Sequence, residues 1–419
     1  MIIRRFGAGI LLAFMILFLL SGMFLLAFRG GTFDMQAVIL GSVFAAFVLI
    51  QYNVLKSAFK HLERFALLIA DFMCIISIVI LYRISPDTAS KQFIWILIGN
   101  ACMVVAMIVI KKSHDFGKLN WVFMFLAIGM LGVTLIFAGV IGGAKNWLTI
   151  GGKDGVSIQP SEFAKILFLI VTAYFLSSRD RKRDMWPYFV FTIACVGLLV
   201  MSKDLGAALL FAGTFLISFY VGTGSVGITL GATAAFAGGA FLSYKVFDHV
   251  QTRVEVWQDP WATYNDKGYQ IVQGLLAIAS GGLLGTGLGL GMPEVIPVGT
   301  SDYIFAAIAE EFGIIVAIGL IALYLVFIIR GILIAMDART KFDKLLVFGA
   351  TAMLSLQSFI IIGGVIKLIP LTGITMPFVS AGGSSMLSAM MQLGIIEGVA
   401  LKNGEYEEAE LEEMGGGVA

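Results

Sequence analysis

Long runs of hydrophobic residues, separated by short polar stretches, dominate the chain. A helix needs about 20 apolar residues to cross a hydrocarbon core of about 30 Å, and about twelve stretches of the sequence meet this need. They are residues 7–28, 36–55, 65–82, 93–110, 119–141, 161–177, 186–202, 205–222, 225–243, 303–329, 344–364 and 382–400. A membrane β-barrel would instead show weak alternating segments of about ten residues. The pattern therefore predicts an all-α integral membrane protein, a polytopic bundle of about twelve transmembrane helices.

The composition agrees with this interpretation and excludes several other classes. The 419 residues are 59% hydrophobic and 13% charged, whereas a soluble domain is about half apolar and about a quarter charged. Lys and Arg number 28 against 27 Asp and Glu, and a nucleic-acid-binding protein usually carries a clear basic excess. The three cysteines lie in apolar runs and the three histidines are scattered. Neither a disulfide framework nor a zinc site is therefore predicted.

The distribution of Lys and Arg residues predicts the orientation of the bundle. An even number of spans places both termini on one side, and more basic residues fall on that side than on the other, among them the loop from Arg179 to Arg183. Such loops are usually cytoplasmic. We therefore expect cytoplasmic termini, an acidic cytoplasmic tail at 401–419 and a large extracellular loop at 244–302. The first apolar run lacks a small-x-small cleavage site, so we expect it to be retained as a helix.

Ionisable residues within the spans are the first candidates for a site. A charge at membrane depth costs at least a few kcal/mol, so it marks either a functional site or a buried pair. Glu162 and Lys165 lie three residues apart, which places them on one face of a helix. Asp204 begins a later span at the same outer side. We predict that these three residues form a structural charge cluster.

Glu310 and Glu311 leave two interpretations open. Both glutamates contribute to a site, or one faces the adjoining loop while the other pairs with a basic residue. For Asp71 and Glu397, which also lie within spans, a structural role is the favoured interpretation.

The long outer loop contains a glycine-rich segment, Gly281-Gly-Leu-Leu-Gly-Thr-Gly-Leu-Gly-Leu-Gly291. No βαβ pattern surrounds it and no Gly-Lys-Ser/Thr follows, so it does not match a nucleotide-binding loop. Phosphate binding through backbone N–H groups is one interpretation. Tight turns and close approach of backbones at the membrane surface are the favoured one.

A series of motifs follows in a characteristic order. They are Gly143-Ala-Lys-Asn-Trp147, Gln159-Pro-Ser-Glu-Phe-Ala-Lys165, Asp204-Leu-Gly206, Arg253-Val254, Gly268-Tyr-Gln270, Ser301-Asp-Tyr-Ile-Phe305, Glu310-Glu-Phe-Gly313, Pro370-Leu-Thr-Gly373, Met376-Pro-Phe378 and Gly382-Gly-Ser-Ser385. The series resembles the signatures of the SEDS family (shape, elongation, division and sporulation), which includes RodA, FtsW and SpoVE. The likeness extends over about residues 119–400.

The resemblance implies an architecture and an activity. It implies a ten-helix core preceded by two additional N-terminal helices, and we divide the chain into N-terminal helices (1–118), a catalytic membrane core (119–400) and the acidic tail (401–419). The implied activity is that of a peptidoglycan glycosyltransferase, which polymerises lipid II at the outer face of the cytoplasmic membrane with a class B penicillin-binding protein as partner. Cell elongation, division and sporulation remain open as its setting. The residues that we expect to bind substrate are Lys145, Trp147, Gln159, Arg253, Tyr269, Gln270, Asp302, Glu310, Lys367, Ser384 and Ser385.

The sequence departs from the family at the position that matters most. The family usually has a catalytic Asp, followed by Pro, shortly before Gly-Tyr-Gln. Ungapped spacing from Arg253 places these two residues at Thr263 and Tyr264. The catalytic role therefore cannot be transferred by position.

Glycan polymerisation requires a general base for the attacking sugar hydroxyl. Of the acids in this stretch, Asp266 is our first candidate because it adjoins Gly268-Tyr-Gln270, and Asp259 is the second. A helix-capping role is the alternative for either residue. The departing pyrophosphate requires positive charge, which outer basic residues supply, or a divalent cation such as Mg²⁺ or Mn²⁺. The basic residues are Lys145, Lys153, Arg253, Lys267 and Lys367.

Two functions of other classes fit some of the same features. A lipid flippase or solute transporter also has many spans and intramembrane acids. A scaffold that only recruits the penicillin-binding protein would lack catalysis. Polymerisation of lipid II without translocation would exclude the transporter, and any polymerisation by purified protein would exclude the scaffold.

Overall fold

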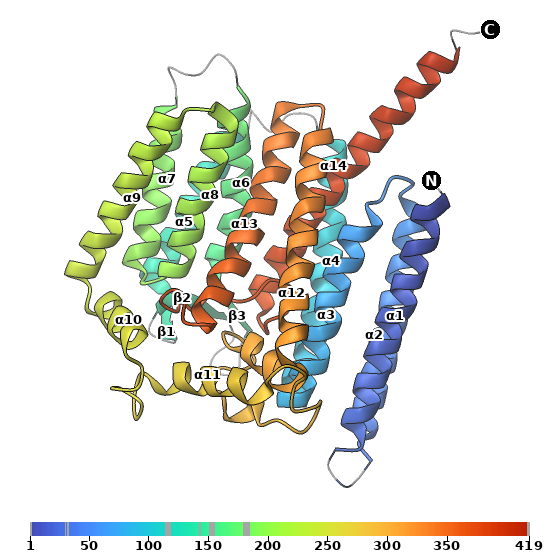
Figure 1. Ribbon diagram of the computed structural model, residues 1–419. Helices are drawn as coiled ribbons and strands as arrows, with labels where there is room; N and C mark the ends of the chain where they lie inside the picture. The colour runs from blue at the N-terminus through green and yellow to red at the C-terminus, as the bar shows by residue number, and fades with distance from the viewer. Residues whose placement is uncertain are drawn as a thin grey trace.

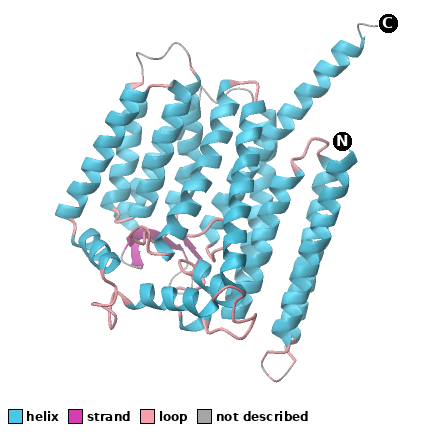
Figure 2. Cartoon of the chain, viewed as in Figure 1, coloured by secondary structure: helices cyan, strands magenta, loops and turns pink. Residues whose placement is uncertain are grey.

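The computed structural model describes residues 2–29, 31, 33–113, 119–141, 144–150, 156–178 and 185–416. It is a bundle of long helices with a small sheet at one end (Figures 1 and 2). The loop Arg179–Arg183, predicted to be cytoplasmic, and Lys153 lie outside the described residues. The helices are α1 Ile2–Ala27, α2 Met35–Ala58, α3 Arg64–Ile84, α4 Pro86–Lys112, α5 Asn120–Phe137, α6 Pro160–Ser177, α7 Trp186–Met201, α8 Leu205–Thr223, α9 Val226–Val246, α10 Asp248–Gln258, α11 Tyr269–Gly281, α12 Ile304–Asp337, α13 Lys341–Val365 and α14 Gly383–Gly416.

Each predicted span corresponds to one of these helices, so the predicted fold class is confirmed. Within the described ranges, eleven helices are long and apolar enough to cross a membrane. The remaining predicted span is α7, which is apolar but has 16 residues. The chain is therefore a multi-pass membrane protein, and Figure 1 places both of its ends on the side opposite α10 and α11.

The interior of the bundle lies around α3, α13 and α14. Nearly the whole length of α3 is buried, and α14 packs along α4. The extent of burial therefore differs strongly between helices, and α9 has no buried residue. The turn between α3 and α4 follows from the sequence. Ser85 caps the N-terminus of α4 by accepting a hydrogen bond from the backbone N–H of Thr88, and Pro86 occupies the first turn, where its missing N–H is not needed.

The prediction was wrong at the end of the fifth span. Helix α5 ends at Phe137 rather than at residue 141, and a three-stranded antiparallel sheet follows. Its strands are β1 Gly139–Ile141, β2 Ala144–Ile150 and β3 Val156–Ile158. Val140 lies opposite Lys145, and Thr149 lies opposite Ser157. These strands are rich in β-branched residues, which favour extended structure, but they are too short to show a clear alternation in the sequence.

The long connection 244–302, predicted as an extracellular loop, contains regular secondary structure. It contains α10, α11 and the 3₁₀ turn Pro293–Val295, and these elements lie across the same end of the bundle as the sheet (Figures 1 and 2). At the other end, α14 continues into the acidic tail, which was predicted as a separate segment. There Glu405 and Glu408 form ion pairs with Lys111 and Lys60.

Candidate active site at one end of the bundle

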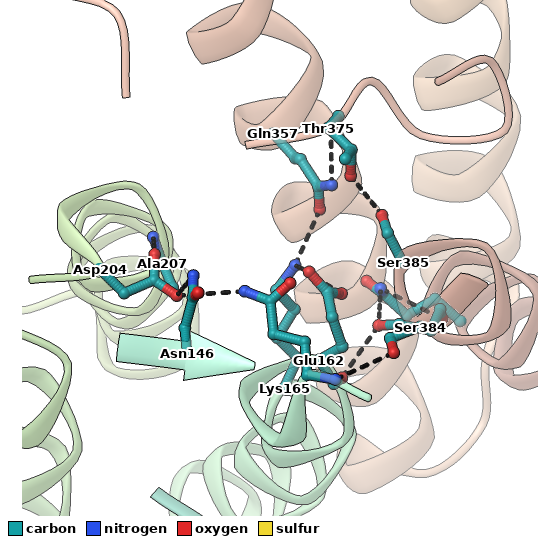
Figure 3. Close-up of polar contacts among 12 residues, drawn as sticks. Asn146, Glu162, Lys165, Asp204, Ala207, Gln357, Thr375, Ser384 and Ser385 are labelled. Atoms are coloured by element: carbon teal, nitrogen blue, oxygen red, sulfur yellow. Dashed lines mark hydrogen bonds and ion pairs between the residues drawn. The ribbon is translucent and has the colours of Figure 1, made fainter. Parts of the chain in front are cut away.

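Most of the motif residues gather where the sheet meets the ends of the helices. Six parts of the chain converge there: strand β2, the N-termini of α6, α8 and α14, the helix α13 and the connection 366–382 between α13 and α14. Figure 3 shows the polar side chains that join them. We call this group the polar centre, and its members are Asn146, Gln159, Glu162, Lys165, Asp204, Gln357, Thr375, Ser384 and Ser385.

Glu162 and Lys165 form the ion pair that the sequence predicted. The Nζ atom of Lys165 lies 2.8 Å from each carboxylate oxygen of Glu162 and donates a further hydrogen bond to Oε1 of Gln357 at 3.2 Å. Lys165 is 1% exposed and Glu162 is 6% exposed. The buried ammonium group therefore has acceptors within the protein, which offsets part of the cost of burying both charges.

Asp204 belongs to the same network but does not bind Lys165. Its Oδ1 caps α8 by accepting from the backbone N–H of Ala207 at 3.1 Å, and its Oδ2 accepts from Nδ2 of Asn146 and Nε2 of Gln159, each at 3.2 Å. The predicted three-membered charge cluster is thus an ion pair and a neighbouring carboxylate held by amides. Gln159 connects them, since its carbonyl oxygen accepts from the backbone N–H of Glu162 at 3.1 Å.

The two motif serines at the start of α14 attach the connection 366–382 to α6. The Oγ atom of Ser384 accepts a hydrogen bond from the backbone N–H of Gln159 at 3.0 Å, and the hydroxyls of Ser385 and Thr375 are hydrogen-bonded to each other. Gln357 then donates to the carbonyl of Thr375 at 2.8 Å. Expected as substrate-binding residues, Ser384 and Ser385 have side chains that are engaged within the protein.

Arg253 connects α10 to the polar centre. Its Nη1 donates to the carbonyl oxygens of Thr372 at 2.9 Å and Leu371 at 3.4 Å. Its positive charge interacts with the carboxylates of Asp204 and Asp302. The guanidinium therefore interacts with two acids that are about 100 residues apart in the sequence.

Asp302 is a half-buried acid that interacts with the charge of Arg253. Burial raises its pKa to about 6, against the opposing effects of a hydrogen bond from Ser301 and the charge of Arg253. The segment that carries it is fixed to the connection 366–382, because Ser380 Oγ donates to the carbonyl of Ser301 at 2.6 Å and Ala381 N–H donates to that of Thr300 at 2.9 Å. A carboxyl group that titrates near neutral pH is suited to proton transfer.

Two basic residues beside this group were not among the predicted site residues. Lys203 is exposed and has a φ of +63°, a left-handed conformation that is unfavourable for a residue other than glycine. Burial lowers the pKa of His249, and the nearby charges of Lys203 and Arg253 lower it further. The basic residue next to Asp204 was a signal in the sequence, but nothing in the sequence placed His249 beside it.

The remaining predicted residues lie around this region. Lys145 is exposed, its backbone N–H donates to the carbonyl of Ser202 at 3.0 Å, and Trp147 is half-buried in the same strand. Lys367 joins the connection 366–382 to the end of α10, where its Nζ donates to the carbonyl of Gln258 at 3.3 Å. Tyr269 and Gln270 are half-buried at the start of α11.

Glu310 and Glu311 have the contacts that the second interpretation describes. Glu310 Oε1 accepts from the backbone N–H of Met292 at 3.0 Å, so it faces the adjoining loop. Glu311 lies 2.7 Å from Nε of Arg83 and accepts from the backbone N–H of Gly289 at 2.5 Å. One carboxylate oxygen of Glu310, a residue expected to bind substrate, is therefore hydrogen-bonded to the residue that follows the glycine-rich segment.

Close approach of backbones explains the glycines at this place. A Cβ atom on Gly285 would lie 2.3 Å from the carbonyl oxygen of Glu311, and one on Gly313 would lie 2.3 Å from the backbone nitrogen of Gly285. Both glycines have positive φ, and the φ/ψ of Gly313 interrupts α12. The favoured interpretation of the glycine-rich segment is thus confirmed.

Asp71 and Glu397 lie away from the polar centre. Asp71 accepts from Nε2 of Gln51 at 3.2 Å, and Glu397 accepts from the backbone N–H of Glu63 at 3.0 Å. These contacts join α3 to α2 and join α14 to the turn between them, as the structural interpretation predicted.

Comparison with known proteins identifies the family. A family described as "Cell cycle protein", which takes in FtsW, RodA and SpoVE, matches residues 59–405. The chain belongs to this family. The match begins directly after α2, so α1 and α2 lie outside it.

Relatives and solved structures agree with this membership. The peptidoglycan glycosyltransferase RodA of Mycobacterium tuberculosis is 36% identical over 328 residues, 74% of this chain and 69% of the relative. The probable peptidoglycan glycosyltransferase FtsW of Geobacter metallireducens is 30% identical over 381 residues, 83% of this chain and 97% of the relative. RodA of Thermus thermophilus has a similar fold, with a TM-score of 0.61 at 23% identity over 81% of this chain and 96% of that chain. A chain from a structure titled "Structural coordination of polymerization and crosslinking by a peptidoglycan synthase complex" reaches a TM-score of 0.68 at 23% identity, over 82% of this chain and 98% of its own.

The connection between α10 and α11 contains Thr263, which the spacing from Arg253 places where the FtsW and RodA family usually has its catalytic Asp. Asp259 caps this turn, since its Oδ1 accepts from the backbone N–H groups of Trp261 at 3.1 Å and Ala262 at 3.2 Å. The alternative for Asp259 was a buried helix-capping role, whereas Asp259 is exposed and caps a turn. Asp266 is exposed on the same connection, and its backbone carbonyl accepts from the N–H of Tyr269 at 3.4 Å.

The site residues do not form a ready-made metal centre. In the part of the chain that the structure describes, no three His, Cys, Asp or Glu side chains are grouped so that they could hold a metal ion. Mg²⁺ is often bound by one or two carboxylates together with substrate phosphates, so a divalent cation at this site would need the phosphates of the substrate as further ligands.

Proposed function

We propose that this chain is a peptidoglycan glycosyltransferase that polymerises lipid II into glycan strands at the outer face of the cytoplasmic membrane. The observation that carries the proposal is the group of Asp204, Arg253 and Asp302 at one end of a membrane bundle. Relatives of 36% and 30% identity, named as a peptidoglycan glycosyltransferase and a probable one, support the reaction class.

The reaction places definite demands on these side chains. The 4-hydroxyl oxygen of the acceptor sugar forms a bond to the anomeric carbon of the donor, and the bond from that carbon to the pyrophosphate oxygen breaks. A general base takes the hydroxyl proton, and the pyrophosphate departs with the electron pair. Arg253 and Lys203 provide positive charge for the leaving group. Both lie at the end of the bundle, where a lipid-linked substrate meets water.

Two carboxylates suit the role of base for different reasons. Asp266 is exposed, so an incoming sugar hydroxyl has access to it. Asp302 is half-buried, and its pKa of about 6 matches the demands of proton transfer. Asp266 remains our sequence-based prediction, and Asp302 is the candidate that the structure adds.

A polymerisation assay with purified protein and lipid II tests the function and the base together. Asp266→Ala and Asp302→Asn are compared with the control Glu255→Gln, which alters an exposed acid on α10. We expect the variant that removes the base to lose activity and the control to keep it. Full activity of Asp266→Ala would exclude Asp266, and absence of polymerisation by the wild-type protein with and without Mg²⁺ or Mn²⁺ would contradict the proposed function.

We also infer the partner and the orientation. The fold is similar to that of a chain from a peptidoglycan synthase complex, which supports a class B penicillin-binding protein as partner. The basic loops of the sequence support cytoplasmic termini and an extracellular α10–α11 region. Lipid II presented on the outer leaflet alone distinguishes this proposal from a flippase, because a polymerase at this face needs no translocation.

A further inference from the structure

The two N-terminal helices, which lie outside the family match, pack against the core on one side. Phe18 of α1 lies between Phe72 of α3, with ring centroids 5.6 Å apart, and Phe312 of α12, with centroids 6.0 Å apart. A Cβ atom on Gly22 would lie 3.3 Å from Val79 of α3 and 3.7 Å from the side chain of Leu288. Leu288 belongs to the glycine-rich segment, so α1 reaches the outer connection directly.

The turn between α1 and α2 is attached to the same region by polar contacts. Arg29 donates from Nη1 to the carbonyl of Arg83 at 3.3 Å, and its Nη2 lies 3.4 Å from Oε1 of Glu294. Asp34, which caps α2, accepts a hydrogen bond from the hydroxyl of Tyr82 at 2.6 Å. The turn is therefore attached both to the end of α3 and to the outer connection.

Arg83 is the centre of this second network. Its side chain is 1% exposed and reaches three partners: Glu294 Oε2 at 3.0 Å, the carbonyl of Gly291 at 2.5 Å and Glu311 at 2.7 Å. Partial burial acts to raise the pKa of Glu294, but its backbone hydrogen bond and the charges of Arg83 and Arg29 hold that pKa below its usual value. Glu294 is thus shared between a buried arginine of the core and an arginine of the N-terminal helices.

The residues held by this network lead directly to the proposed active site. The glycine-rich segment and the turn after it, residues 281–303, connect α11 to α12 and carry Asp302. Contacts with Arg29 and Arg83 fix one part of this connection, and contacts with the connection 366–382 fix the part around Asp302. The first part is joined to Asp302 by the short stretch of backbone from Glu294 to Asp302.

We propose that the α1–α2 hairpin is a brace that holds residues 281–303, and that Arg29 and Glu294 are positioning residues of the polymerase site. The effect on activity rests on the proposed function, whereas the effect on the conformation of residues 281–303 does not. Arg29 and Glu294 are each partly exposed, at 38% and 47% for the side chains. Such ion pairs contribute little individually, so the expected effects are modest and graded.

Hydrogen exchange of the full-length protein in lipid nanodiscs measures the brace independently of activity. Arg29→Gln removes the charge, Arg29→Lys keeps it, and Lys91→Gln is the matched control, since Lys91 is an exposed cation near the start of α4 at the same end. We expect Arg29→Gln to accelerate exchange at the N–H groups of Gly289 and Met292 by about two- to fivefold. Arg29→Lys should restore part of the protection, and Lys91→Gln should match the wild type.

The same variants in the polymerisation assay test the positioning role. We expect Arg29→Gln to lower kcat by about two- to fivefold with little change in KM for lipid II. In the double variant Arg29→Gln, Glu294→Gln, the effects on exchange should be less than multiplicative, because both changes break one contact. Exchange in Arg29→Gln that equals the Lys91→Gln control would overturn the brace. A wild-type protein without polymerase activity would overturn the proposed function and leave the exchange result as a test of the brace.

Discussion

Replacing Lys165 with methionine tests how much the polar centre depends on its buried ion pair. Methionine keeps most of the volume of the lysine side chain but carries no charge and donates no hydrogen bond. The change leaves the carboxylate of Glu162, which is 6% exposed, without its cation, and it leaves Oε1 of Gln357 without its donor. Breaking a buried pair by removing one partner costs about 3–5 kcal/mol, a large part of the 5–15 kcal/mol by which a typical protein is stable.

Activity should fall together with stability. Glu162 and Gln159 belong to the same first turn of α6, and Gln159 holds Oδ2 of Asp204 at 3.2 Å. A rearrangement around an unpaired Glu162 therefore disturbs the carboxylate next to Arg253. We expect Lys165→Met to lower the unfolding temperature of the detergent-solubilised protein clearly and to abolish most lipid II polymerisation, although Lys165 transfers no proton.

The double variant Glu162→Gln, Lys165→Met is the control for this reasoning. It removes both charges, so no uncompensated charge remains in the interior, and replacing a buried pair completely is often neutral or stabilising. We expect it to recover much of the stability that Lys165→Met loses. Near-normal stability and polymerisation in Lys165→Met alone would refute the argument, because the pair would then be incidental to the fold of the site.

Two further predictions concern Asp302 and Gly206. The pKa of Asp302 is raised to about 6, so Asp302 becomes protonated as pH falls through 6. The protonated group can neither act as a base nor pair with the charge of Arg253. Polymerisation should decline there, and a rate–pH profile without that inflection in the wild type would contradict the role. The contribution of Asp302 to the free energy of unfolding has the opposite pH dependence: it is greatest at acid pH and is lost as pH rises through about 6. Asp302→Asn should abolish this pH dependence of stability. Gly206→Ala places a Cβ atom 2.3 Å from Cγ2 of Ile374 and 3.1 Å from the carbonyl of Thr372. Overpacking of this kind costs about 1–3 kcal/mol. Gly238→Ala places a Cβ atom that meets no atom within 4 Å, so this control should change neither the unfolding temperature nor the polymerisation rate.

The spans were predictable because each helix must satisfy its own backbone in lipid and cover it with apolar side chains. That requirement produces an apolar run of about 20 residues in the sequence. The sheet at 139–158 leaves no such mark, because its strands have between three and seven residues and depend on contacts between them. The sequence predicted the Glu162–Lys165 pair for a similar local reason, since three residues along a helix bring two side chains together.

Contacts between distant parts of the chain were beyond local reasoning. Arg83 and Glu311 are in contact although they lie far apart in the sequence, and nothing in either segment indicates the other as its partner. Asp204 was placed at the correct end of the bundle, but its amide partners Asn146 and Gln159 depend on a sheet that the pattern did not show. His249 was missed because its significance arises only from Lys203 and Arg253 beside it.

The two polar networks explain why the chemistry is assigned to one end of the bundle. One network runs from the Glu162–Lys165 pair through Gln159 and Asp204, and the other runs from Arg29 through Arg83 to the glycine-rich segment. Each network consists largely of side chains that satisfy one another, which suits structural support more than catalysis. Residues 300–302 connect to both, by the backbone of 281–303 on one side and by Ser380 and Ala381 on the other. The backbone beside Asp302 is therefore anchored at Thr300 and Ser301, while its own half-buried carboxyl group interacts with the charge of Arg253. A rigid support with a titratable group at its junction suits a base that must accept a proton from the hydroxyl of a bound sugar.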